Sequence, residues 1–192
     1  MQRVETFLTQ YLIEKQVIDE ADREVYQYGL LRGVEMLGNL GICMLIAWWL
    51  DMVLEGIFFF IFFIPLRSFA GGLHLKNYIF CFMLSLFTFI AILMLAKWCV
   101  LPMYMLIVAF GGLVGVLMIL YPVENVHRRV TENENQYFRK KLKLFIVVDA
   151  IIIIVSLAIK KHSIVMMADL VLVLVVFTML IAKVANKNQK RM

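Results

Sequence analysis

Residues 77–97 read NYIFCFMLSLFTFIAILMLAK, a 21-residue stretch whose one charge is its last residue. A helix that crosses a membrane needs about 20 mainly apolar residues, so this stretch predicts a transmembrane span. Five further apolar segments surround it along the chain, at residues 30–50, 52–66, 99–121, 143–159 and 164–183. The second and fifth of the six segments are short, which favours a tilted or partly re-entrant geometry there. The fold class predicted is an all-α integral membrane protein with six spans.

The composition supports a membrane protein and argues against other classes. Hydrophobic residues make up 63% of the 192 residues and charged residues 17%, against about 45–50% and 25% in soluble domains. The net charge is +5. In a membrane protein, basic residues serve first to orient the chain in the bilayer, so this charge does not indicate nucleic-acid binding. The acidic N-terminal region lacks the pattern of a cleavable signal peptide, so the mature chain is expected to begin near Met1.

The chain divides into three expected regions. Residues 1–28 place Phe7, Tyr11 and Leu12 at helical spacing among polar residues, which predicts an amphipathic helix on the membrane surface or a soluble N-terminal helix. Residues 29–184 form the expected six-span membrane domain, and residues 185–192 a basic cytoplasmic tail.

The basic residues predict the orientation. With the N-terminus inside, the inner segments hold sixteen of the 19 Lys and Arg residues, and the outer segments hold Lys97, Lys160 and Lys161. Cytoplasmic loops are enriched in basic residues, so both termini are expected in the cytoplasm. The inner connection at about 122–142 is then the one sizeable soluble segment.

The reactive residues gather in residues 67–81, RSFAGGLHLKNYIFC, at the expected cytoplasmic edge. On one straight helix His74 and Cys81 would lie about 10 Å apart along the axis, whereas proton transfer needs about 3 Å. Gly71 and Gly72 supply the backbone freedom for a break before the third span, so that His74 can fold back toward Cys81. An imidazole next to a thiol favours the nucleophilic thiolate.

Other residues are candidates for supporting this pair. Arg67 can favour the thiolate, bind a substrate carboxylate or anchor the span at the interface. Ser85 lies one turn beyond Cys81 on the same face and can line a pocket. Asp149 is a candidate to orient His74, although a structural hydrogen bond is the simpler interpretation. Glycine pairs, interfacial histidines and single cysteines are also common as plain structural residues.

The motif Arg67-x-x-x-Gly71-Gly72-x-His74, followed after six residues by Cys81, resembles the AgrB family, the accessory gene regulator membrane endopeptidases of Gram-positive quorum sensing. The acidic N-terminus, the six apolar segments and the inner loop opening YPVENVHRR are similar as well. The resemblance implies a cysteine endopeptidase of the cell membrane with His74 and Cys81 as the catalytic pair. Its expected substrate is an AgrD-type propeptide, which loses its C-terminal tail through an acyl-enzyme thioester and becomes a thiolactone ring.

The resemblance also implies a homodimer in the lipid bilayer, and no cofactor is expected. The alternative is a non-enzymatic small transporter or sensor component, in which Asp149 would matter more than Cys81. The sequence has three widely spaced cysteines and three scattered histidines, which argue against a metal site and against a zinc hydrolase.

Overall fold

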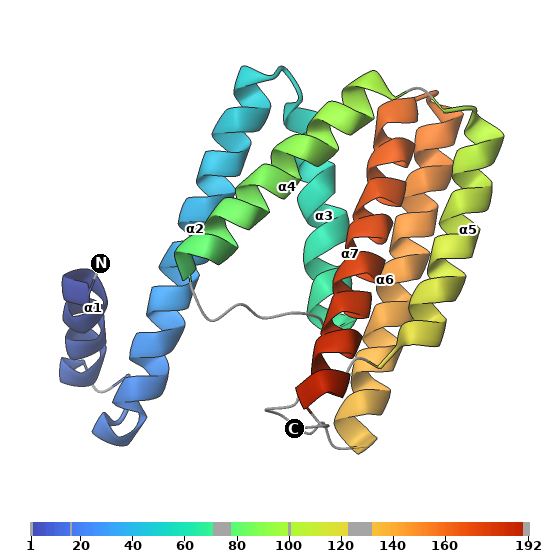
Figure 1. Cartoon of the computed structure of the whole chain (residues 1–192). Coiled ribbons are helices and arrows are strands. Elements are labelled where there is room, and N and C mark those ends of the chain that lie inside the picture. Colours follow the sequence, from blue (N-terminus) through green and yellow to red (C-terminus); the bar gives the residue numbers. More distant parts are fainter. Residues whose placement is uncertain (1, 16, 71–77, 100, 123–131, 190–192) are drawn as a thin grey trace. The chain divides into compact units, whose positions relative to one another are not determined.

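The computed structural model describes residues 2–15, 17–70, 78–99, 101–122 and 132–189. These residues contain no strand and form seven α-helices and one short 3-10 turn, Glu20–Asp22. The helices are α1 (Gln2–Glu14), α2 (Arg23–Trp49), α3 (Val53–Ala70), α4 (Tyr78–Trp98), α5 (Met103–Leu120), α6 (Glu132–Ala158) and α7 (His162–Gln189) (Figure 1). The chain falls into two compact units, residues 1–46 and 47–192, and α2 runs from the first into the second.

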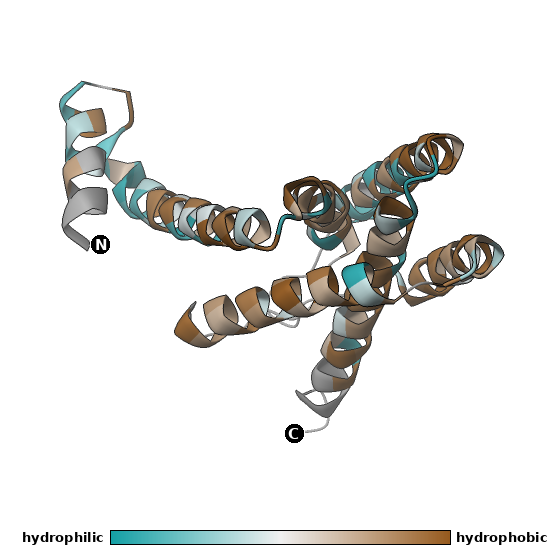
Figure 2. Cartoon of the chain, turned by 90° about the horizontal axis from the view of Figure 1, so that it is seen from above, coloured by the Kyte–Doolittle hydropathy of each residue, from teal (hydrophilic) through white to brown (hydrophobic). Residues whose placement is uncertain are grey.

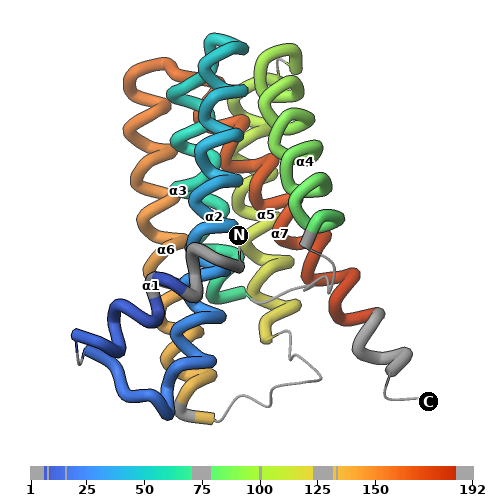
Figure 3. Tube along the Cα trace, turned by 90° about the vertical axis from the view of Figure 1, so that its left-hand side faces the viewer, coloured from blue at the N-terminus to red at the C-terminus, as the bar shows by residue number. Residues whose placement is uncertain are grey.

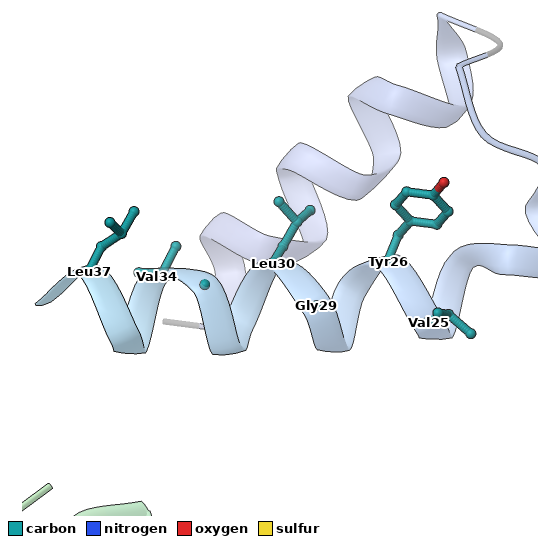
Figure 4. Close-up of a pocket in the computed structure, with 7 residues that line it drawn as sticks. Val25, Tyr26, Gly29, Leu30, Val34 and Leu37 are labelled. Carbon is teal, nitrogen blue, oxygen red and sulfur yellow. The ribbon is translucent and has the colours of Figure 1, made fainter. Parts of the chain in front are cut away.

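The first unit contains α1 and most of α2. The predicted N-terminal helix is confirmed as α1, and its Phe7 and Tyr11 side chains are 70% and 50% exposed. The guanidinium of Arg23, the first residue of α2, donates to Gln10 Oε1 at 3.2 Å and to Glu20 Oε1 at 2.7 Å. An apolar strip with a shallow depression follows one side of α2 (Figure 4), formed by Val25, Tyr26, Gly29, Leu30, Gly33, Val34 and Leu37.

The second unit is a bundle built around α7. Helix α7 contacts α3, α4, α5 and α6, and most of its apolar stretch is buried. From α3 to α7 the chain alternately descends and ascends, while α4 is inclined to the others (Figures 1 and 3). The α4–α5 and α6–α7 connections lie at the end drawn uppermost in Figure 1, here called the upper end. The C-terminal ends of α3 and α5 and the beginning of α6 lie toward the lower end, and α4 begins at about half the height of the bundle.

Hydrophobic residues predominate along the helices of this bundle (Figure 2), and many of their side chains are exposed. Phe87, Val108 and Ile119 are 72%, 73% and 80% exposed. Contact of such side chains with water is unfavourable, whereas contact with lipid tails is not. Trp49 and Trp98 are 82% and 75% exposed at the upper ends of α2 and α4, the interfacial position that tryptophan prefers in membrane proteins. Helices α2, α3, α4, α5 and α7 are long and apolar enough to span a membrane. The protein is therefore an all-helical, multi-pass membrane protein.

Two predicted segments have different bounds in the structure. Helix α3 extends beyond the predicted segment 52–66 and continues to Ala70, with Pro65 inside it. Proline is tolerated inside membrane helices when neighbouring groups satisfy the local backbone. Helix α6 begins at Glu132, so the second half of the expected inner loop 122–142 is helical. Acidic residues in its first turn favour that start through the helix dipole.

The predicted Gly-Gly break before the third apolar segment lies outside the described residues. Helix α3 ends at Ala70 and α4 begins at Tyr78, which are the bounds on either side of residues 71–77.

Candidate functional site

Arg67 of α3 and Cys81 of α4 interact electrostatically across the bundle. Arg67 lies in the last turn of α3, and Cys81 is the fourth residue of α4, one turn inside its beginning as predicted. The Arg67 side chain is largely withdrawn from solvent, and its charge interacts electrostatically with Cys81. The thiol of Cys81 is free and exposed.

Aromatic contacts hold the end of α3 that carries Arg67. The Phe69 ring stacks on Phe145 of α6 with centroids 5.5 Å apart, and it is 6.1 Å from Phe138 of the same helix. Such pairs contribute about 0.5–1.5 kcal/mol beyond simple burial. These contacts fix the last turn of α3 against α6. This role of Phe69 was not predicted from the sequence. An aromatic residue in an apolar helix gives no sequence signal that separates this role from ordinary packing.

A second aromatic cluster joins α3 to α4. Phe89 of α4 is 1% exposed, meets the Phe59 ring edge-on at 5.0 Å and stacks on Phe60 at 5.4 Å. This cluster holds the middle of α3 against the middle of α4.

The remaining predicted residues differ in their placement. Ser85 follows Cys81 by one turn of α4 and is half-buried. Asp149 is buried at 4% exposure within α6, nine residues before Ala158, whereas Cys81 lies at the lower end of α4. No described contact joins Asp149 to Arg67 or Cys81, and its role toward the histidine stays a prediction. His74, Gly71 and Gly72 lie outside the described residues.

Other polar residues of the apolar segments have local partners. Arg32 and Glu35 form an ion pair at 2.8 Å, as their spacing predicted. Ser163 of α7 donates to Glu55 Oε1 of α3 at 2.9 Å. Asp169 of α7 is the exception, because it is 5% exposed and neither carboxylate oxygen has a hydrogen-bond partner in the described part of the chain.

The two remaining cysteines differ in their exposure. Cys43 is buried at 1% exposure, with its sulfur 3.8 Å from Asn39 Oδ1, which fits a packing residue. Cys99 is free and exposed just after α4. Among the described residues, no three His, Cys, Asp or Glu side chains lie together where they could hold a metal ion.

Comparisons with known proteins identify the family. The family model of accessory gene regulator B, AgrB, matches residues 6–181, which is nearly the whole chain. Searches of curated proteins and of solved structures give no significant match. The match includes both Arg67 and Cys81 and all but the last part of the central helix α7. The chain belongs to the accessory gene regulator B family.

Proposed function

We propose that this protein is a membrane cysteine endopeptidase that cleaves an AgrD-type propeptide and closes the remaining peptide into a thiolactone ring. The observation that carries the proposal is the free, exposed thiol of Cys81 in the first turn of α4, with which the Arg67 charge interacts electrostatically. Membership of the AgrB family, which is known for peptide processing, supports the same reaction class. His74 and Cys81 are the proposed catalytic pair.

The first half-reaction forms an acyl-enzyme. His74 takes the thiol proton, and the Cys81 thiolate attacks the carbonyl carbon at the cleavage site. The carbon–nitrogen bond breaks, and the departing tail takes the proton from the imidazolium of His74. The peptide is left attached to the Cys81 sulfur as a thioester, with Arg67 favouring the thiolate before attack.

The second half-reaction closes the ring. The thiol of the peptide's own cysteine gives its proton to His74 and attacks the thioester carbonyl. Cys81 leaves as a thiolate and recovers the proton. One thioester replaces another, so the step is close to energetically neutral, whereas hydrolysis would be strongly downhill. A site recessed at a membrane edge protects the intermediate by excluding water.

The proposed setting is the cell membrane, with six spans and both termini in the cytoplasm. Helix α6 would complete the six spans as the fifth along the chain. Its residues 142–158 carry only Lys143 and Asp149 as charged residues, and α6 packs on α3 and α7. Lysine near the end of a span can extend its ammonium group to the interface. In this setting Gly71 and Gly72 form the break that admits His74, while Ser85 and Asp149 are supporting residues. A homodimer is part of the same proposal.

The experiment is coexpression with a candidate propeptide, followed by mass spectrometry of the peptide products. Loss of cleaved peptide in both Cys81→Ala and His74→Ala, at normal protein levels, is the expected result. The exposed Cys99→Ala is the matched control, because it removes a free thiol at the upper end and leaves Cys81 in place. Unchanged cleavage by Cys81→Ala would refute the proposal.

One observation favours a second candidate, a non-enzymatic transporter. Asp169 is a buried carboxyl without a hydrogen-bond partner among the described residues, and such groups in membrane helices commonly mark transport paths. This function predicts that Asp169→Asn abolishes activity in the cell while Cys81→Ala retains it. The coexpression experiment with both variants separates the two functions.

A further inference from the structure

Four basic side chains follow one another at the lower end of α6. Arg139, Lys140 and Lys143 are exposed and Lys141 is half-buried. Neither of the two ion pairs between described residues, Arg23–Glu20 and Arg32–Glu35, involves any of them. Four cations therefore stand without acidic partners in the described structure, at the point where the helix turns apolar.

The exposed face of α6 continues from these cations as an apolar row. Lys140 is followed at helical spacing by Leu144, Val147 and Ile151, which are 52%, 55% and 55% exposed. The opposite face packs into the bundle and holds Leu142, Ile146, Asp149 and Ile153, each at most 9% exposed. The exposed face is thus cationic at one end and aliphatic along the rest.

The dimensions of this face match half of a bilayer. From Lys140 to Ile151 the helix rises about 16 Å, at about 1.5 Å per residue. One leaflet of the hydrocarbon core is about 15 Å thick. A phosphate group near Lys140 and Lys143 would therefore place acyl chains along Leu144, Val147 and Ile151.

An exposed aromatic residue completes the interfacial end. Tyr137 is 54% exposed, and the Lys141 ammonium lies 5.6 Å from the centre of its ring. Tyrosine rings prefer the headgroup level of a bilayer. The ring and the cations thus mark the same depth along α6.

We propose that this face of α6 is a binding site for an anionic phospholipid, with its phosphate held by Lys140, Lys143 and Arg139. The occupant is a lipid because the aliphatic row continues directly from the cations. The phosphate of the bound lipid would also neutralise basic residues in the lower half of α6, where a typical span has none. This inference depends on membrane insertion and not on the peptidase activity.

The test is native mass spectrometry of the full chain in neutral detergent, titrated with phosphatidylglycerol or phosphatidylcholine of identical acyl chains. The wild type is expected to retain phosphatidylglycerol at least fivefold better. Each basic residue near an anionic surface accounts for about a fivefold change in binding, so Lys140→Gln with Lys143→Gln should remove the preference. Lys140→Arg with Lys143→Arg, which keep both charges, should retain it.

The matched control is Lys160→Gln with Lys161→Gln, which removes the same charge at the upper end of the bundle. This control is expected to keep the phosphatidylglycerol preference. Equal retention of the two lipids by the wild type would overturn the proposal, as would loss of the preference in the control. Displacement of phosphatidylglycerol by glycerol phosphate alone would assign the cations to a free phosphate group and refute a lipid site. A Leu144→Cys variant that forms a disulfide dimer and retains no lipid would show that a second copy covers the face.

Discussion

Replacing Asp169 by leucine should stabilise this protein. The two side chains have the same number of heavy atoms with the same branching, so the change removes polarity and adds little volume. Asp169 is 5% exposed and both its oxygens lack hydrogen-bond partners in the described structure. A buried polar group without a partner costs about 1–3 kcal/mol of stability. Asp169→Leu should recover that amount, which corresponds to a rise of about 2–12 °C in the unfolding midpoint of a chain of this size.

The assay is thermal unfolding in mixed micelles, followed by the fluorescence of the three tryptophans. Glu55→Met is the matched control, because Glu55 accepts a hydrogen bond from Ser163 at 2.9 Å. Losing that bond should lower the free energy of unfolding by about 0.5–1.5 kcal/mol. A lower midpoint for Asp169→Leu would show that the carboxyl has a partner in solution and would refute the reasoning.

Three further substitutions test the lower end of the bundle. Arg67→Gln removes the charge that interacts with Cys81, so cleavage of the coexpressed propeptide should fall severalfold, while Arg67→Lys should retain most of it. Equal cleavage by all three proteins would contradict the electrostatic role. Phe69→Ala removes the ring contacts with α6 and should increase hydrogen exchange in the last turn of α3. The increase should correspond to the loss of about 1–3 kcal/mol from two aromatic pairs. Unchanged exchange would count against this anchoring. Burial raises the pKa of Tyr121, so its hydroxyl stays protonated and donates to Asn135 Oδ1 at 2.8 Å. Tyr121→Phe should therefore cost about 0.5–1.5 kcal/mol and expose the beginning of α6 to protease, and resistance equal to the wild type would argue against that bond.

The sequence predicted the helices better than their ends. Long apolar runs have only one backbone solution in a membrane, so α2 to α5 and α7 follow from composition. The segment predicted at 52–66 ended too early, because proline is tolerated inside helices that span a membrane. The beginning of α6 was placed too late because its charged residues looked like a loop, although helices tolerate charges well on an exposed face.

The packing of the helices could not be predicted in the same way. Helix α7 is central and α4 is inclined, yet both are apolar on all sides, so their sequences carry no periodic signal of a buried face. The interaction of Arg67 with Cys81 could be anticipated because both residues belong to one short motif of the sequence. The anchoring of that end by Phe69 depends on α6, far along the chain, and needed the structure.

The most direct test of a thioester at Cys81 is the intact mass of the protein after incubation with a propeptide whose ring-closing cysteine is replaced by alanine. Without that cysteine the second half-reaction cannot proceed, so the acyl-enzyme should accumulate. The expected mass increase equals the mass of the peptide without its C-terminal tail less one water. The adduct should be located at Cys81 by fragmentation and removed by hydroxylamine. Absence of this adduct while the tail is still released, or an adduct that persists in Cys81→Ala, would contradict the account.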